Sequence, residues 1–103
     1  LRTLEIADLM ITHGGLNTIQ ECIAHNVPML VYPLSSTWDQ RGNASRVLFH
    51  GLGLLGNIQK DNDSEIETKI RQLLTNDHYK KKSQALNQRI STLNEVTDID
   101  LSF

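Results

Sequence analysis

Three short apolar runs, each bounded by Gly, Pro or Asn, constrain the fold of this sequence more than any other feature. They cover residues 9–11 (Leu-Met-Ile), 29–32 (Met-Leu-Val-Tyr) and 52–58. Runs that are continuous rather than alternating indicate strands covered on both faces, as in parallel sheets. The segments 16–25 and 39–50 between them are long enough for crossover helices. The first half therefore predicts the order β-α-β-α-β.

The second half reads as helical beyond residue 58. Ser64 and Glu67 have the Ser-x-x-Glu spacing of a capping box. The apolar residues that recur at helical spacing after it are Ile66, Ile70, Leu73 and Leu74. Asn76 is predicted to end this helix, and Asp77 to cap a second one. The buried stripe of that second helix is predicted to be Tyr79, Leu86, Ile90 and Leu93, with lysines 80–82 facing water.

The length and pattern together predict one α/β domain. A chain of 103 residues supports a single compact domain, and we expect a Rossmann-like three-layer unit, a short parallel sheet of about three strands flanked by helices. Such a sheet has two open edges, so we expect modest stability, or pairing with a second copy in a homodimer or with a missing partner. Because the chain begins at Leu1 inside an amphipathic segment, we expect it to be part of a longer protein.

Charge and composition exclude several classes of protein. Ten Lys and Arg against twelve Asp and Glu give a net charge of −2, which leaves no basic excess for nucleic-acid binding. The apolar stretches are far shorter than a membrane span of about 20 residues. A single cysteine forms no internal disulfide, and no charged leader with an apolar core begins the chain. A cytoplasmic protein is the expectation.

The segment 12–18 (Thr-His-Gly-Gly-Leu-Asn-Thr) lies between the end of a predicted strand and the start of a helix. Free N–H groups in the first turn of a helix, together with its dipole, favour an anion there, and two glycines let a phosphate approach the backbone closely. The residues that could contact the anion are His13, Gly14, Gly15, Asn17 and Thr18. Taken alone, the segment is equally consistent with a turn that binds nothing.

Further residues follow this segment in a defined order. They are Glu21, Val27-Pro28, Pro33, Asp39-Gln40, Asn43 and Gly51-x-Gly53. The series, which runs from about Ala7 to Gly53, resembles the nucleotide-sugar-binding signature of the family 1 glycosyltransferases, and most closely the bacterial, macrolide-type branch of the UDP-glycosyltransferases. The resemblance implies the GT-B fold, in which two Rossmann-like halves face each other across a cleft and the C-terminal half holds the donor. Residues 1–103 would then be part of that C-terminal, nucleotide-sugar-binding domain.

The resemblance also implies roles for individual residues. The diphosphate would be held by His13, Gly14, Gly15, Asn17 and Thr18. Glu21 would accept hydrogen bonds from ribose hydroxyls, and Asp39 and Gln40 would bind hydroxyls of the transferred sugar. Without the resemblance, Glu21 reads as an exposed helix charge and Asp39 as a helix cap. Trp38 either lines the sugar cleft or is a buried anchor. The segment between Pro33 and Asp39 is two residues longer than in the plant-type pattern.

The implied activity is transfer of a hexose from UDP or a related nucleotide sugar to a small, hydrophobic acceptor. Negative charge develops on the leaving diphosphate, and preorganised donors stabilise it, so neither a metal nor another cofactor is expected. The general base and the acceptor pocket belong to the N-terminal half in this family. We therefore expect no catalytic residue in these 103 residues and no activity from the chain alone. The rival readings are a non-catalytic nucleotide-sugar-binding module that needs a partner chain, and a structural remnant.

Two other features suggest chemistry but favour a structural role. Asp61-Asn62-Asp63 has the Asp-x-Asp spacing of metal-dependent glycosyltransferases, yet it immediately precedes the predicted capping box and favours helix capping. Cys22 is predicted to be a small core residue rather than a nucleophile. The remaining histidines, His25, His50 and His78, share no zinc-like spacing with it.

Overall fold

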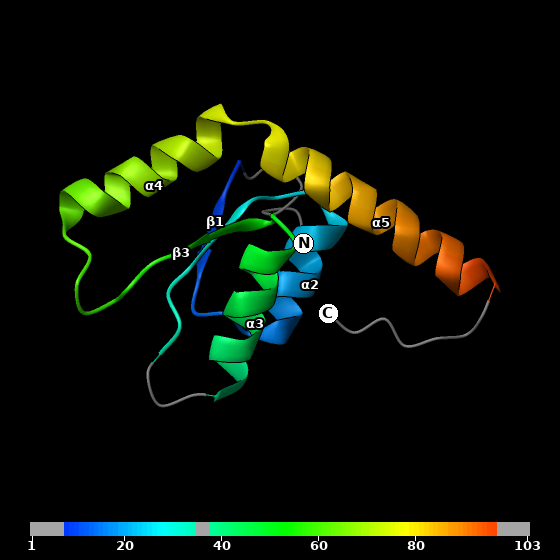
Figure 1. The fold of residues 1–103 in the computed structure, drawn as a ribbon, viewed down its shortest axis with the longest axis horizontal. Coiled ribbons are helices and arrows are strands. Elements are labelled where there is room, and N and C mark those ends of the chain that lie inside the picture. Colours follow the sequence, from blue (N-terminus) through cyan, green and yellow to red (C-terminus); the bar gives the residue numbers. More distant parts are fainter. Residues whose placement is uncertain (1–7, 35–37, 97–103) are drawn as a thin grey trace.

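The computed structural model describes residues 8–34 and 38–96 (Figure 1). The elements follow one another as β1 (Met10–Thr12), α2 (Leu16–Ala24), β2 (Met29–Val31), α3 (Trp38–Phe49), β3 (Gly53–Leu55), α4 (Asp63–Thr75) and α5 (His78–Val96). The predicted order β-α-β-α-β followed by two helices is confirmed. The third apolar run was expected to be a longer strand, but β3 ends at Leu55 and the chain then turns into a loop.

The sheet is parallel, with the strands in the order β1-β2-β3. Met10 lies opposite Met29, and Met29 opposite Gly53. Helix α2 connects β1 to β2, and α3 connects β2 to β3, so both connections run in the same direction across the sheet. Right-handed connections of this kind place both helices on the same face of the sheet. Figure 1 shows α2 and α3 together on one side of the sheet and α4 on the other. The expected three-layer α/β unit is confirmed.

Strand β2 is buried on both faces, because its side chains alternate between two cores. Met29 and Val31 pack with the buried residues of α2 and α3, among them Ile19, Cys22 and Val47. Leu30 and Tyr32 pack on the opposite face with Leu73 of α4 and Tyr79 of α5. This double coverage explains why the run is continuously apolar. The edge strand β1 is less covered, and its Ile11 is 51% exposed.

The start of α4 differs from the prediction. Asn62 is the N-cap, and its Oδ1 accepts a hydrogen bond of 2.9 Å from the Glu65 backbone N–H. The Ser64 and Glu67 capping box is therefore wrong, because Ser64 lies inside the helix. Asn76 ends the helix as predicted. Leu74, predicted on the apolar stripe, is 51% exposed, while Leu73 carries the contact with the sheet.

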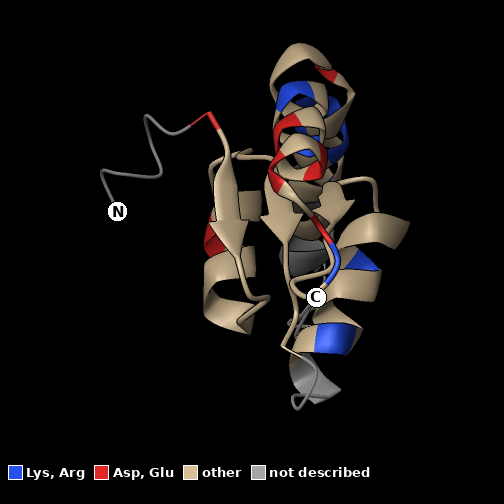
Figure 2. Cartoon of the chain, turned by 90° about the vertical axis from the view of Figure 1, so that its left-hand side faces the viewer, with Lys and Arg blue, Asp and Glu red and all other residues tan. Residues whose placement is uncertain are grey.

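Helix α5 follows at once; its Tyr79 packs with Leu30 of β2, and the helix also packs against α2. Ser83 Oγ and Asn87 Nδ2 both donate to the Ile23 carbonyl oxygen, at 3.1 and 2.6 Å. Tyr79 is buried as predicted, Leu86 and Ile90 are half-buried, and lysines 80–82 are exposed. The Leu93 side chain lies outside the described residues. Figure 2 shows charges of both signs on the helix at the top, which begins with α4, while the strands carry none.

Candidate functional site

The turn between β1 and α2 is built around Gly14. Its φ of 98° lies in the region that favours glycine. The Gly14 N–H donates to Thr12 Oγ1 at 3.1 Å, and its carbonyl oxygen accepts from Asn43 Nδ2 of α3 at 3.0 Å. The Asn43 bond is buried and joins two elements 29 positions apart in the sequence. The turn is therefore fixed from both sides.

The N-terminus of α2 is open. Gly15 is its N-cap, no side chain caps the helix, and its first turn contains no acidic residue. A Cβ placed on Gly15 would have no atom within 4 Å. Leu16 and Asn17 are exposed and Thr18 is half-buried. The backbone donors of this first turn thus lie at the carboxyl edge of the sheet with no acidic residue in the turn itself, an arrangement suited to an anionic ligand.

His13 lies beside this turn and is held by the next strand. Its Nδ1 is 3.0 Å from the carbonyl oxygen of Tyr32, directly after β2. Because a carbonyl oxygen only accepts, Nδ1 is the donor in this bond. The imidazole itself is exposed. The backbone of β2 therefore orients the ring while leaving it accessible to a ligand.

A pocket of about 360 Å³ opens beside His13 on the α4 side of the sheet. Its walls come from the end of β1, the residue after β2, the loop between β3 and α4, and α4 itself. The lining residues are Ile11, Thr12, His13, Tyr32, Asn57, Ile58, Asp61 and Ile66. Ile11 and Ile58 are each about half exposed. An apolar hollow thus adjoins the polar turn.

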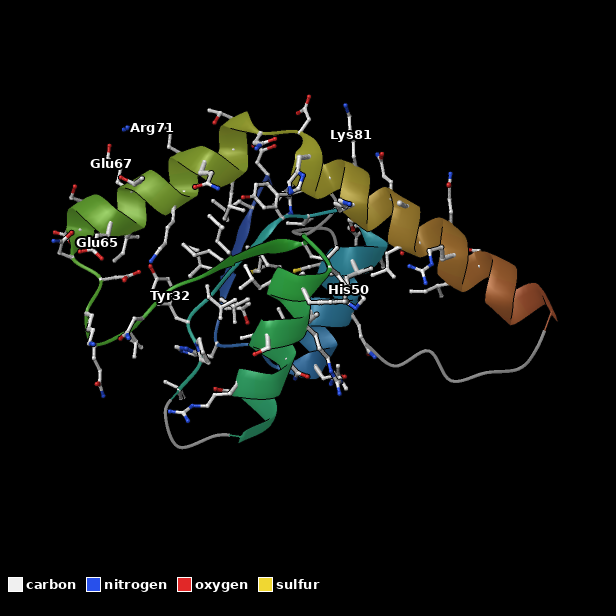
Figure 3. The ribbon with its side chains drawn as sticks, viewed as in Figure 1. Tyr32, His50, Glu65, Glu67, Arg71 and Lys81 are labelled. Atoms are coloured by element: carbon white, nitrogen blue, oxygen red, sulfur yellow. The ribbon has the colours of Figure 1, made fainter. Side chains whose placement is uncertain are left out.

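A short polar network closes one side of the pocket. The Tyr32 hydroxyl donates to Asp61 Oδ2 at 2.9 Å, and Lys69 Nζ donates to the same oxygen at 2.5 Å. Figure 3 shows the Tyr32 side chain between the sheet and α4. The hydrogen bond from Lys69 is the main cause that lowers the pKa of Asp61. Burial, with the neighbouring Asp61 carboxylate, raises the pKa of Tyr32 to about 12. The network attaches the loop before α4 to the end of β2.

The other predicted site residues lie on α2 and α3. Glu21 is one turn beyond Thr18 and is half-buried. Gln40 approaches the glycine turn, since a Cβ on Gly14 would lie 3.1 Å from its carbonyl oxygen, and its side-chain Oε1 accepts from the Leu34 N–H at 3.1 Å. Asp39 lies in the first turn of α3, which begins at Trp38. Asp39 therefore lies inside the helix rather than at the position before it. The side chains of Trp38 and Asp39 lie outside the described residues.

Two residues that shape the site were not predicted as part of it. Asn43 fixes the glycine turn, and Tyr32 supplies both the carbonyl that orients His13 and the hydroxyl that binds Asp61. Asn43 carried a usable signal, because an amide beside the core positions Ala44 and Val47 needs a partner when buried. The sequence signal for Tyr32 was weaker, because a residue at the end of an apolar run is expected to be part of the hydrophobic core.

The features favoured as structural have structural roles. Cys22 is 0% exposed, and burial raises the pKa of its thiol to about 11. Within Asp61-Asn62-Asp63, Asn62 caps α4 and Asp61 binds Tyr32 and Lys69. Over residues 8–34 and 38–96, no group of three or more His, Cys, Asp or Glu side chains is placed to hold a metal ion.

A family model described as the glycosyltransferase family 28 C-terminal domain matches residues 2–100 of the chain. The chain belongs to this family. Its sequence is 40% identical over 73 residues to a zeaxanthin glucosyltransferase of Pantoea ananas, covering 71% of this chain and 16% of the relative. It is 39% identical over 82 residues to UDP-glucuronosyltransferase 3A1 of Xenopus laevis, covering 78% of this chain and 15% of the relative.

Solved structures agree with this family membership. The crystal structure of the glycotransferase of kitacinnamycin superposes with a TM-score of 0.81 at 28% identity, over 86% of this chain and 23% of that one. The glycosyltransferase VinC, solved in complex with DTDP, shares the fold with a TM-score of 0.78 at 22% identity, over 87% of this chain and 22% of VinC. The family 28 domain here therefore spans less than a quarter of these proteins. None of its described helices is both long and apolar enough to cross a membrane.

Proposed function

We propose that this chain is the donor-binding part of a glycosyltransferase that moves a hexose from UDP, or a related nucleotide, to a small hydrophobic acceptor. The observation that carries the proposal is the open N-terminus of α2, where Gly15 leaves the first-turn donors without a side-chain cap and the turn itself contains no acidic residue. The names of the relatives support it, because they specify UDP, glucosyl or glucuronosyl groups and, in one case, zeaxanthin.

The donor would lie across the carboxyl edge of the sheet. Its diphosphate would contact the turn and first helical residues, namely His13, Gly14, Gly15, Asn17 and Thr18. The ribose would follow along α2 to Glu21, whose carboxylate is an acceptor for hydroxyl groups. The sugar would reach the start of α3, where Asp39 and Gln40 lie. Gln40 uses its oxygen on Leu34, so its amide N–H groups are the ones we assign to the sugar.

In the reaction, the bond between the anomeric carbon and the leaving phosphate oxygen breaks, and negative charge grows on the diphosphate. The first-turn amides of α2 and the His13 ring would stabilise that charge in fixed positions. The acceptor hydroxyl and the base that takes its proton would be supplied by a part of the protein outside these residues. The proposal uses no metal ion and no other cofactor.

The second candidate is a nucleotide-sugar-binding module that acts only with a partner chain. It is supported by the same open helix terminus, because a phosphate would bind these amides in a binding module just as it would in a transferase. The two candidate functions predict different results in an activity assay. A single-chain transferase forms glycoside when the full-length protein meets UDP-glucose and an apolar alcohol, whereas the module requires a second polypeptide.

The donor site itself is tested by titrating UDP-glucose into the ¹⁵N-labelled protein, with a chelator present, and following the amides of residues 14–18. We expect saturable shifts there and at Glu21. His13→Ala should weaken binding, whereas His25→Ala is the matched control, since His25 is an exposed histidine at the opposite end of the same helix. Unchanged spectra in the full-length protein would refute the donor site.

A further inference from the structure

The hydrogen bond of His13 determines which of its ring nitrogens carries a proton. Nδ1 faces the Tyr32 carbonyl oxygen at 3.0 Å. The carbonyl has only lone pairs, so Nδ1 must hold a hydrogen for the bond to exist. In a neutral imidazole only one nitrogen is protonated, which leaves Nε2 with a lone pair. The neutral ring thus presents an acceptor, not a donor, to anything that approaches from the open side.

A phosphate oxygen also has only lone pairs. It repels an acceptor nitrogen and is bound by a ring that is protonated at both positions. We propose that binding of the donor diphosphate at the α2 N-terminus is coupled to uptake of a proton on His13 Nε2. The inference rests on the proposed function and adds to it a dependence on pH. The ligand class that selects the cationic ring is a diphosphate carrying two negative charges.

Imidazole is the side chain that ordinarily changes charge between about pH 5 and 8. Tyr32 and Asp61 line the pocket together with His13, and Lys69 and Glu65 of α4 lie next to these two residues. Glu21 lies on α2, and Asp39 and Arg41 lie at the start of α3, where the Asp39 side chain is outside the described residues. The hydrogen bond from Lys69 lowers the pKa of Asp61, and that of Tyr32 is raised to about 12, so the first stays ionised and the second neutral. Carboxylate, ammonium and guanidinium groups do not ordinarily titrate in this interval.

Binding of the donor therefore changes the number of protons on the His13 ring. A neutral ring in the free site becomes an imidazolium against the diphosphate in the complex. One proton enters from solvent for each donor bound, and by linkage the affinity falls as the pH rises. Losing a charge-assisted hydrogen bond weakens binding about tenfold to a hundredfold. Departure of the nucleotide would release the same proton.

The test uses UDP-glucose, because both of its phosphates are esterified and it does not titrate in the range studied, whereas the terminal phosphate of UDP does. Dissociation constants are measured by calorimetry from about pH 5.5 to 8.5 in buffers of different ionisation enthalpy, which report proton uptake directly. We expect uptake of up to one proton and affinity at least about tenfold weaker at the alkaline end. His13→Gln, which keeps a neutral amide donor near the Nε2 position, should bind with a flat pH profile. His25→Gln should keep the slope.

The tautomer is checked independently in the ligand-free protein by long-range ¹H–¹⁵N spectra of the histidine rings. We expect a proton on Nδ1 and a lone pair on Nε2 of His13 at alkaline pH. Binding that is independent of pH without proton uptake, or a protonated Nε2 in the neutral ring, would overturn this inference and leave the donor site standing. Absence of binding at every pH in the full-length protein would overturn both.

Discussion

Gly14 and Gly15, in the turn between β1 and α2, should respond differently to substitution by alanine: one change affects stability and the other affects ligand binding. Gly14 has φ 98°, and a Cβ there would lie 3.1 Å from the Gln40 carbonyl oxygen and 3.1 Å from Val31 Cγ1. Gly15 has φ −65°, and a Cβ there meets nothing within 4 Å. Gly14→Ala should therefore destabilise the fold, while Gly15→Ala should spare the fold and obstruct the ligand.

The magnitudes follow from these positions. A non-glycine residue held in the left-handed region costs about 1–3 kcal/mol, and crowding against Val31 and the Gln40 backbone adds about 1 kcal/mol. Alanine restricts the unfolded chain and returns about 0.4–1 kcal/mol. Gly14→Ala should thus lower the free energy of unfolding by about 1–3.5 kcal/mol. At Gly15 the same gain offsets the preference for glycine over alanine at an N-cap, which leaves a change within about 0.5 kcal/mol.

Urea denaturation followed by far-ultraviolet circular dichroism measures the first effect, and titration with UDP-glucose measures the second. Gly15→Ala should unfold at nearly the urea midpoint of the parent yet bind the donor more weakly, because its methyl group lies on the approach to the first-turn amides. Equal free energies of unfolding for the two variants would refute the strain argument. Full donor affinity in Gly15→Ala would refute the placement of the diphosphate.

Two further predictions concern titration of the core and the loop. The Cys22 thiol, buried and with its pKa raised to about 11, should resist iodoacetamide at about pH 8 until urea unfolds the chain, and stability should fall as the pH rises above the ordinary thiol pKa of about 8.5; labelling before unfolding would contradict this. The pKa of Asp61 is lowered by Lys69, so its contribution is complete above the ordinary carboxyl pKa of about 4 and is lost as the pH falls through its folded value. The stability difference between the parent and Asp61→Asn, measured by urea unfolding, should therefore be constant above about pH 5 and shrink as the pH falls below about 4; a difference that stays constant at acidic pH would show that the carboxylate is not involved.

The sequence predicted the architecture well because the strands of this fold carry a strong signal. A run such as 29–32, apolar at every position, has few solutions other than a strand covered on both faces, and the structure places it at the sheet centre. The turn from strand to helix could also be predicted, because Gly14 and Gly15 lie between an apolar run and a helical pattern. These signals are local and need no knowledge of distant contacts.

Most of what the sequence did not predict depends on distant contacts. The cap of α4 is a local exception, because the Ser-x-x-Glu spacing pointed to Ser64, whereas Asn62, two residues earlier, accepts from the Glu65 N–H and satisfies the first turn. The network of Tyr32, Asp61 and Lys69 joins residues up to 37 positions apart through side chains that have other plausible partners. The Tyr32 carbonyl that orients His13 carries no side-chain signature at all.

The polar contacts at the two ends of α2 have a mechanical consequence. At one end the Asn43 amide holds the Gly14 carbonyl, and at the other Ser83 and Asn87 hold the carbonyl of Ile23. Hydrogen bonds to α3 at one end and to α5 at the other thus hold the helix in place along its axis. A proposed donor would meet amides already in place, so little of its binding free energy would be consumed in ordering the protein. Removing the Ser83 hydroxyl, which binds the C-terminal end of α2, would therefore make the proposed site at the N-terminal end of the same helix less rigid.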